Sequence, residues 1–514
     1  MTWWRDAVVY QIYPRSFRDA NGDGVGDLDG IRQQLAYLAW LGVDALWLSP
    51  FYPSPMHDFG YDVSDFVGVD PLFGTLEDFD NLVHEAHELH LRVIVDWVPN
   101  HTSNEHPWFV ESRSSRDSAR RDWYVWRDAK ADGGVPNNWV RAWSDESVWT
   151  WDAATAQYYL HCFLESQPDL NWANGAVRDA MHDTLRFWLE RGVDGFRMDV
   201  VHLLGKDVER DDPEELRALS HVPLNNVALT HDYLREVRRL IDGYDANRVS
   251  IGEVFLLDPE RVADYYGDHD ELHLSFNFAP LFIGWRAASW EDVIVRTEQA
   301  FEGRGAWPTW VMSNHDTRRM ATRLGGDEER IRAAILLLLS LRGTAFLYAG
   351  EELGLEDAVV SPASMIDPGG RDGCRAPMPW TSEPGHGWVH EPWLPFEERA
   401  GEKSVDNQML SDESVLHFSR QMLGLRRSSN ALRRGAIRAV HCVGDVLVFD
   451  RVAEEQHLRV MVNFSSSDVE VGDESPLVVS SSRHHRPGLL GPGEALVLEV
   501  AHADNESRRG RSGL

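Results

Sequence analysis

The chain has 514 residues, 43% of them hydrophobic, and carries 83 Asp and Glu against 50 Lys and Arg, a formal net charge of −33. This length and apolar content can build one large domain with smaller ones attached. The acidic balance argues against nucleic acids and anionic membrane surfaces as partners.

Cysteine use and hydropathy bear on cellular location. The three cysteines, Cys162, Cys374 and Cys442, are widely spaced and form neither a CxxC motif nor a disulfide framework. The stretch MTWWRDAVVYQIYP lacks a basic region followed by an apolar one, and no run of about 18 apolar residues suggests a membrane span. We therefore expect a cytoplasmic protein that is a monomer or a small homo-oligomer.

Short apolar runs that indicate β-strands recur along the chain. A helix-like segment usually separates one run from the next. The predicted strands are residues 8–17, 45–50, 92–101, 195–201, 248–256, 272–278, 307–316 and 343–354. The helical segments include residues 31–42, 76–90, 176–192 and 328–341. Such alternation implies parallel pairing with right-handed crossovers. Eight units predict an α/β fold, a (β/α)₈ TIM barrel.

Other segments interrupt and follow this barrel. Residues 102–168, rich in Trp and polar residues, predict an inserted subdomain after the third strand. Residues 429–502 change to strand-like alternation and predict a C-terminal antiparallel β-sandwich domain. Residues 503–514 are typical of a disordered tail. The barrel would then comprise residues 1–101 and 169–428.

The loop DANGDGVGD, which follows the first predicted strand, places oxygen ligands at alternate positions. They are Asp19, Asn21, Asp23, the Val25 carbonyl and Asp27. The spacing resembles the first nine positions of an EF-hand loop, although Gly30 stands where the bidentate Glu belongs. We expect one structural Ca²⁺ or Mg²⁺ ion here; the alternative is an Asx-rich turn without a metal.

Charged groups and imidazoles follow four of the predicted strands. In chain order they are Asp96 and His101, Arg197 and Asp199, Glu253, and His315 and Asp316. Because the C-terminal ends of barrel strands form one rim, these side chains should converge on a site there. A structural ion pair between Arg197 and Asp199 is the alternative, and Asp96 would mainly support Arg197.

Three carboxylates without a Cys/His cluster indicate either glycoside cleavage or a metal site. Glycoside cleavage needs one protonated carboxyl group and one ionised carboxylate. Glu253 lies between apolar residues, which would raise its pKa and suit the acid. Arg197 lies two residues before Asp199, on the same strand face, and would keep this aspartate ionised.

The motifs DWVPNH, GFRMDVVH, GEVF and SNHD resemble, in order and spacing, the four signature regions of the α-amylase family, glycoside hydrolase family 13. YQIYPRSF near the start is a further match. GYDVSDF, QPDLNW and RDGCRAPMPW are similar to the α-glucosidase and oligo-1,6-glucosidase branch. The resemblance covers nearly the whole chain and implies a retaining double displacement.

The resemblance also implies roles for individual residues. Asp199 would be the nucleophile, Glu253 the general acid/base and Asp316 a stabiliser of the transition state. The implied substrate-binding residues are Asp62, His101, Phe163, Gln167, Arg197, His315 and Arg375. Asp62 and Arg375 would grip the non-reducing end of the bound sugar.

Without the resemblance, some of these residues have simpler interpretations. Asp62 could be a turn residue, Arg375 a loop salt bridge and Phe163 a core aromatic. The arginine motif also departs from the usual RxxxRTPMQW pattern, because Cys374, Ala376 and Pro379 replace residues of that pattern. The resemblance therefore does not determine the conformation of this loop.

The implied function is an exo-acting α-glucosidase that cleaves α-1,4 or α-1,6 bonds in small α-glucosides or oligosaccharides, with possible transglucosylation. The alternatives are a glucosyltransferase or isomerase of the trehalose or isomaltulose synthase type, and a catalytically inactive subunit. Intact Asp199, Glu253 and Asp316 disfavour the last. Val200 after the nucleophile favours α-1,6 cleavage, although it also suits a strand core.

Overall fold

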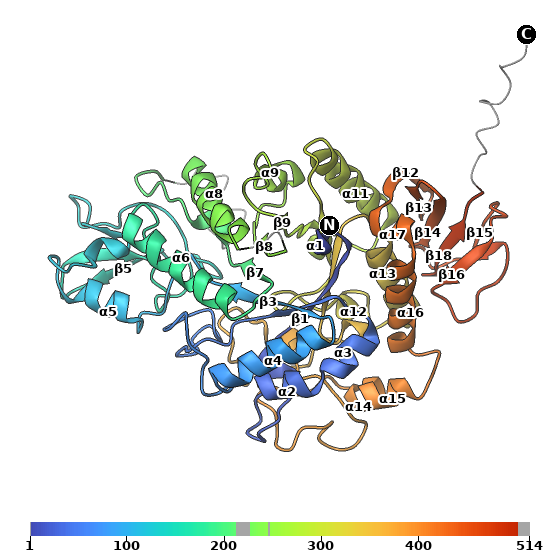
Figure 1. The fold of residues 1–514 in the computed structure, drawn as a ribbon, viewed down its shortest axis with the longest axis horizontal. Helices are drawn as coiled ribbons and strands as arrows, with labels where there is room; N and C mark the ends of the chain where they lie inside the picture. Colours follow the sequence, from blue (N-terminus) through green and yellow to red (C-terminus); the bar gives the residue numbers. More distant parts are fainter. Residues whose placement is uncertain (1, 212–226, 245–246, 502–514) are drawn as a thin grey trace, which may run out of the picture.

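The computed structural model describes residues 2–211, 227–244 and 247–501 (Figure 1). The predicted tail, 503–514, lies outside the described residues. Eight parallel strands form one sheet in the order β10-β11-β1-β2-β3-β7-β8-β9, which confirms the predicted barrel. Their bounds are β1 Val8–Ile12, β2 Ala45–Leu48, β3 Arg92–Trp97, β7 Gly195–Met198, β8 Val249–Gly252, β9 Leu274–Ser275, β10 Thr309–Val311 and β11 Thr344–Tyr348.

The barrel closes between β9 and β10 through a side chain. Only two residues of β9 pair with β8, and β10 pairs with β11 on its other side. The Thr309 hydroxyl donates to the Ser275 carbonyl at 2.9 Å, and Thr309 Oγ1 accepts from the Asn277 N–H at 3.0 Å. This threonine replaces the missing ladder bonds where the short strand ends.

Helices cover the outside of the barrel (Figure 1). Those that follow barrel strands are α2 Leu28–Gln33, α3 Leu35–Leu41, α4 Leu76–Glu88, α6 Gly175–Glu190, α8 Ala228–Asp242, α9 Pro259–Asp264, α10 Ala279–Phe282, α11 Ala287–Glu302, α12 Met320–Arg323, α13 Glu328–Ser340 and α16 Val415–Ser428. The predicted helix at 31–42 is divided between α2 and α3 at Gln34. α4 begins with a capping box made by Thr75 and Asp78, a local signal that fixes its start.

The segment between β3 and α6 forms a small lobe beside the barrel. It contains α5 Pro107–Ser114 and a three-stranded sheet of β4 Trp126–Arg127, β6 Gln157–Leu160 and β5 Trp149–Asp152. An isolated bridge between His101 and Asp169 joins the two ends of the insertion. The lobe therefore rises from the rim where β3 ends, next to the predicted site.

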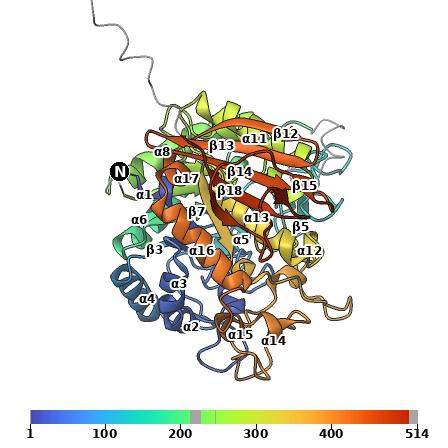
Figure 2. The ribbon, with the colours of Figure 1, turned by 90° about the vertical axis from the view of Figure 1, so that its right-hand side faces the viewer.

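The C-terminal part is a five-stranded antiparallel sheet with a separate two-stranded one. The strands are β12 Ala436–Val443, β13 Val446–Ala453, β14 Gln456–Asn463, β18 Ala495–Glu499 and β16 Leu477–Ser480, then β15 Val469–Glu470 with β17 Leu489–Leu490. Figure 2 shows the larger sheet lying over α13. This explains why residues 331–340 of α13 are buried on every face: they lie between the barrel and this sheet.

No helix in the described ranges is long and apolar enough to cross a lipid bilayer.

Candidate active site

Three carboxylates meet one guanidinium at the carboxyl ends of β3, β7 and β8. Asp96 pairs in register with Arg197 on the neighbouring strand, and Asp199 and Glu253 directly follow β7 and β8. Arg197 Nη1 donates to Asp96 Oδ1 at 2.6 Å and to Asp199 Oδ1 at 2.7 Å, while Nη2 contacts Glu253 Oε2. Arg197 is 2% exposed, so this network lies beneath the rim and away from bulk water.

One positive charge cannot neutralise three carboxylates in this dry environment. Burial raises the pKa of Asp199 well above its ordinary value; Arg197 opposes the rise, and the charges of Glu253 and Asp96 add to it. Arg197 therefore favours the ionised form of Asp199, whereas burial and the two neighbouring carboxylates favour the protonated form.

The residue after Asp199 adopts a strained backbone conformation. Val200 has φ +37°, in the left-handed region that a β-branched residue rarely occupies. This turn aims the Val200 N–H at Glu253 Oε2, at 3.2 Å, and lets the Val201 N–H donate to the Glu253 carbonyl. Strain of this kind persists where the surrounding structure requires it, often at functional sites.

Two buried histidines are held in the neutral form. Burial lowers the pKa of His101 to about 4 and that of His315 to about 3. Each ring lies against polar partners: Tyr61 Oη is 2.7 Å from His315 Nε2, and Gln167 Nε2 is 3.2 Å from His101 Nε2. A neutral imidazole can donate at one nitrogen and accept at the other, which suits contacts with hydroxyl groups.

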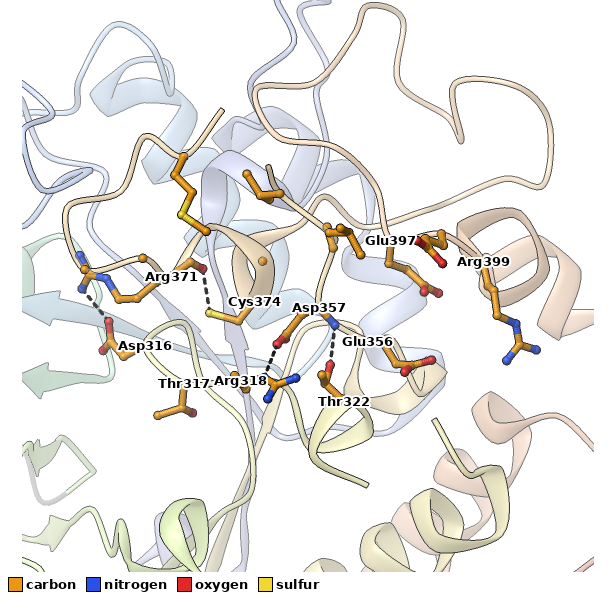
Figure 3. Close-up of a pocket in the computed structure, with 18 residues that line it drawn as sticks. Asp316, Thr317, Arg318, Thr322, Glu356, Asp357, Arg371, Cys374, Glu397 and Arg399 are labelled. Carbon is orange, nitrogen blue, oxygen red and sulfur yellow. Dashed lines mark hydrogen bonds and ion pairs between the residues drawn. The ribbon is translucent and has the colours of Figure 1, made fainter. Parts of the chain in front are cut away.

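Asp316, Arg371 and Asp58 form a charged wall, of which Figure 3 shows Asp316 and Arg371. Arg371 donates to Asp316 Oδ1 at 2.9 Å and to Asp58 Oδ1 at 2.6 Å, and Asp367 holds its remaining nitrogens. Burial would raise the pKa of Asp316, but His315, Arg371 and Arg375 lower it well below its ordinary value. Asp316, with a side chain 30% exposed, therefore stays ionised.

A cavity of about 270 Å³ lies between these groups. It is lined by Asp58, Tyr61, His101, Trp143, Phe163, Asp199, Val200, Glu253, Phe255, Phe282, Asp316, Thr317 and Arg371. It is slightly smaller than the roughly 300–1,000 Å³ of typical ligand pockets. A small molecule that enters it would meet the two catalytic carboxyl candidates on one side and the charged wall on another.

Asp62 and Arg375 are not among the residues that line this cavity. Asp62 is fully buried, and its carboxylate accepts from the Ser54 hydroxyl and from the N–H groups of His57 and Asp58. Arg375 is fully buried as well; it donates to the His315 carbonyl at 2.9 Å and contacts Asp367 and Asp316. Both residues shape the wall from behind, and Asp58 and Arg371 face the cavity instead.

Of Gln167 and Phe163, likewise, only one lines the cavity. Phe163 lines the cavity, with its ring 5.1 Å from that of His101. Gln167 is fully buried and donates to Asp58 Oδ2 at 3.0 Å, so it orients the wall rather than lining the cavity.

The loop with the unusual sequence RDGCRAPMPW is tied directly to the β10 loop. Cys374 Sγ lies 3.1 Å from the Arg371 carbonyl and 3.3 Å from the His315 carbonyl, so its thiol can donate to either one (Figure 3). The short helix η5, Asp372–Arg375, fixes the spacing of the two arginines.

Sequence reasoning missed several residues that line the cavity. They are Asp58, Tyr61, Trp143, Phe255, Phe282, Thr317 and Arg371. All but Phe282, which ends α10, lie in loops, where no periodicity tells an inward side chain from an outward one. Two of them could have been found from the motifs. Arg371 is the first residue of RDGCRAPMPW, and Asp58 lies two residues before GYDVSDF.

Comparison with known proteins places the chain in context. Residues 11–435 match the family model "Alpha amylase, catalytic domain". A probable α-glucosidase of Rhizobium meliloti is 43% identical over 92% of this chain and 91% of the relative. An oligo-1,6-glucosidase of Heyndrickxia coagulans is 36% identical over 91% of this chain and 93% of the relative. The crystal structure of an α-glucosyl transfer enzyme superposes with a TM-score of 0.92 at 40% identity, covering 98% of this chain and all of that one.

Proposed function

This chain belongs to the α-amylase family, and we propose that it is a retaining, exo-acting α-glucosidase that releases terminal α-linked glucose from short oligosaccharides or small α-glucosides. The observation that carries the proposal is the cavity in which Asp199 and Glu253 share one guanidinium and the Asp58–Arg371–Asp316 wall lies beside them.

The placement of the two carboxyl groups supports a retaining reaction. Asp199 and Glu253 follow adjacent parallel strands and contact different nitrogens of Arg197. This favours the separation of about 5–5.5 Å of retaining pairs over the roughly 6.5–9.5 Å of inverting ones. The proposed reaction requires Glu253 as the acid and Asp199 as the ionised carboxylate.

In the first step Asp199 attacks the anomeric carbon while Glu253 gives its proton to the leaving oxygen. A glucosyl ester on Asp199 forms, and the bond to the leaving group breaks. In the second step Glu253 takes a proton from water, the water oxygen attacks the anomeric carbon, and the ester bond to Asp199 breaks. Two inversions give α-glucose.

The remaining residues would position the sugar. The carboxylate of Asp316 and the neutral ring of His101 suit hydrogen bonds to its hydroxyl groups. His315, predicted to bind the sugar, does not line the cavity, and its two ring nitrogens contact Gln11 and Tyr61. We assign the grip on the non-reducing end to Asp58 and Arg371, since they face the cavity. A wall of ion pairs at that end leaves no path for a longer chain, which accounts for exo action.

A transfer reaction is the second candidate, because water and an acceptor hydroxyl compete for the same glucosyl ester. Phe282, 53% exposed, lines the cavity close to Phe255 and offers an apolar surface to an acceptor. The similarity to an α-glucosyl transfer enzyme also supports it. Val200 beside the nucleophile, together with the oligo-1,6-glucosidase relative, supports cleavage of α-1,6 bonds.

We further propose one structural Ca²⁺ or Mg²⁺ ion in the Asp19–Asp27 loop. Asp19 and Asp27 are each 4% exposed, and burial raises the pKa of Asp27, as does the nearby charge of Asp19, so a cation would stabilise both. Among the residues the structure describes, no three His, Cys, Asp or Glu side chains are placed to hold a metal ion, and Asp19, Asp23 and Asp27 accept backbone N–H groups instead. These three side chains would turn toward the ion on binding, and the Asn21 amide and the Val25 carbonyl would complete the set. These oxygen ligands fit a hard cation. The ion would hold the loop and take no part in the reaction.

Proton NMR of the first product tests the mechanism. With maltose or isomaltose as substrate, α-glucose should appear before mutarotation produces β-glucose. Asp199→Asn should lower kcat at least about 1,000-fold with an unchanged fold, because the nucleophile is lost. β-Glucose as the first product would mean inversion and would refute the roles given to Asp199 and Glu253. Rapid mid-chain cleavage of amylose would refute exo action.

A further inference from the structure

Lys206 is a buried lysine that the proposed reaction does not use. It follows the short helix η3, Val201–Leu203, beyond the end of β7, and its side chain is 4% exposed. The ammonium group donates to the Leu203 carbonyl at 2.8 Å and lies 3.3 Å from Asp169 Oδ2. Its third contact, at 2.8 Å, is the side-chain oxygen of Asn100, the residue before His101.

The contact with Lys206 fixes the orientation of the Asn100 amide. An ammonium group has N–H donors and cannot accept a hydrogen bond. The Asn100 atom that faces Lys206 must therefore be the oxygen, and the amide nitrogen then lies 3.1 Å from His101 Nδ1. Since an amide nitrogen only donates, His101 Nδ1 accepts from it.

This contact determines which ring nitrogen of His101 carries the proton. Burial lowers the pKa of His101 to about 4, so the ring is neutral at neutral pH and has one N–H group. With Nδ1 as the acceptor, that proton is on Nε2. Lys206 thus selects the tautomer of His101 through the Asn100 amide.

The Nε2–H group of His101 lies next to a group that cannot accept its proton. Gln167 Nε2 is 3.2 Å away, and this amide is held in one orientation at both ends. Its oxygen accepts from the Leu164 N–H at 3.0 Å, and its nitrogen donates to Asp58 Oδ2 at 3.0 Å. His101 lines the cavity, so a hydroxyl oxygen of a bound sugar can accept the proton, as can the Tyr61 carbonyl near the ring.

We propose that Lys206 is a positioning residue of the active site: through Asn100 it holds His101 in the tautomer that donates from Nε2 to a hydroxyl oxygen of the bound sugar. This role is additional to the structural contact with Asp169, at one end of the inserted lobe. Its kinetic consequence rests on the proposed hydrolysis of α-glucosides, whereas the tautomer itself does not.

Nitrogen NMR of protein labelled at its histidine rings tests the tautomer directly. The signals of His101 are those that the His101→Ala spectrum lacks, and in the parent the proton should be on Nε2. Asn100→Asp keeps the size of the side chain, but a carboxylate beside Lys206 only accepts, so a proton should appear on Nδ1. A parent ring with its proton on Nδ1, or an Asn100→Asp ring without one there, would overturn the proposal.

A double-mutant cycle tests the kinetic role. Lys206→Met removes the ammonium group and should lower kcat/KM on maltose about 3- to 10-fold in the parent. In the His101→Ala background it should change kcat/KM less than about twofold, because no imidazole remains to be oriented. The matched control is Lys403→Met, which removes another lysine with a mostly buried side chain, paired with Glu356 and Glu397, and should have little effect in either background.

An equal loss in both backgrounds would show that Lys206 acts on the fold or on another residue, and would overturn the proposal. An unchanged kcat/KM in the Lys206→Met protein would do the same. If Lys206→Met does not fold, Asn100→Asp takes its place in the cycle. A parent that does not turn over maltose would refute the proposed hydrolysis, and the NMR comparison would still decide the tautomer.

Discussion

Arg197 is the residue on which the charge balance of the site depends. Its guanidinium contacts Asp96, Asp199 and Glu253 and is cut off from water. Removing it would leave three buried carboxylates without a cation, a change that costs several kcal/mol. The positions of Asp199 and Glu253 and the ionisation of Asp199 therefore depend on the same side chain.

Asp58 and Asp62 have different proposed roles: Asp58 binds the sugar, and Asp62 stabilises the loop. Asp58→Asn should lower kcat/KM on maltose and isomaltose about 10- to 100-fold, because charged hydrogen bonds contribute about 1.5–3 kcal/mol. Asp62→Asn should mainly lower the unfolding temperature, since Asp62 bonds only to its own loop. Steady-state kinetics and thermal unfolding of both variants check this. A larger kinetic loss in Asp62→Asn would show that Asp62, and not Asp58, binds the sugar.

Glu351, buried behind the β10 loop, should make stability depend on pH. It is 3% exposed and accepts from the Ser313 hydroxyl at 3.2 Å and from the Tyr348 N–H at 3.0 Å. Burial raises its pKa to about 7. The folded state then binds the proton more tightly than the unfolded chain does, so this stability is complete at low pH and is lost as pH rises through about 7.

Glu351→Gln should therefore be more stable than the parent at pH 8, by on the order of 2–3 kcal/mol. The difference should shrink as pH falls toward about 5, near the ordinary pKa of a glutamate. Denaturant unfolding at several pH values measures it. An equal difference at both ends of the range would show that Glu351 does not titrate there.

Among the elements, the Asp19–Asp27 loop connects β1 to α2 and determines how that helix begins. The Asp27 carboxylate accepts from the Gly30 N–H at 2.6 Å as the N-cap, and also from the N–H groups of Ala20 and Asn21. The same side chain thus closes the loop and starts the helix, so a bound ion would stabilise both.

EDTA should lower the unfolding temperature by about 2–5 °C, because an ion that binds only the folded chain stabilises it. Activity of the still-folded enzyme should change little. Asp27→Asn keeps a capping side chain but removes the charge, so EDTA should have no further effect on its unfolding temperature. Loss of rate without loss of stability would contradict a structural role.

At the scale of the whole molecule, the excess of acidic side chains gives a net charge of −33, and these side chains repel one another across the folded surface. Raising NaCl from about 10 to 200 mM should raise the unfolding temperature by screening this repulsion. The value of kcat/KM for maltose should change less than twofold, because a neutral sugar is not steered by the field. Scanning calorimetry and initial rates test the two parts; a strong salt dependence of kcat/KM would point to a charged substrate.

The barrel could be predicted from the sequence because each strand is a short apolar run, and eight such runs alternating with helices leave few topologies. The same rule placed Arg197, Asp199, Glu253 and Asp316 at one rim. The two-residue strand β9 is shorter than its apolar run, because the chain leaves the ladder there and Thr309 takes over.

Only the tertiary structure decided which loop residues face the cavity. Asp58 and Asp62 look alike in the sequence, as do Arg371 and Arg375, because the direction of a loop side chain depends on packing between distant segments. Asp58 faces inward since Arg371 and Gln167 hold it there, from 313 and 109 residues away in the chain. The sequence thus determined the rim and the proposed catalytic carboxylates through strand geometry, and long-range ion pairs determined the walls.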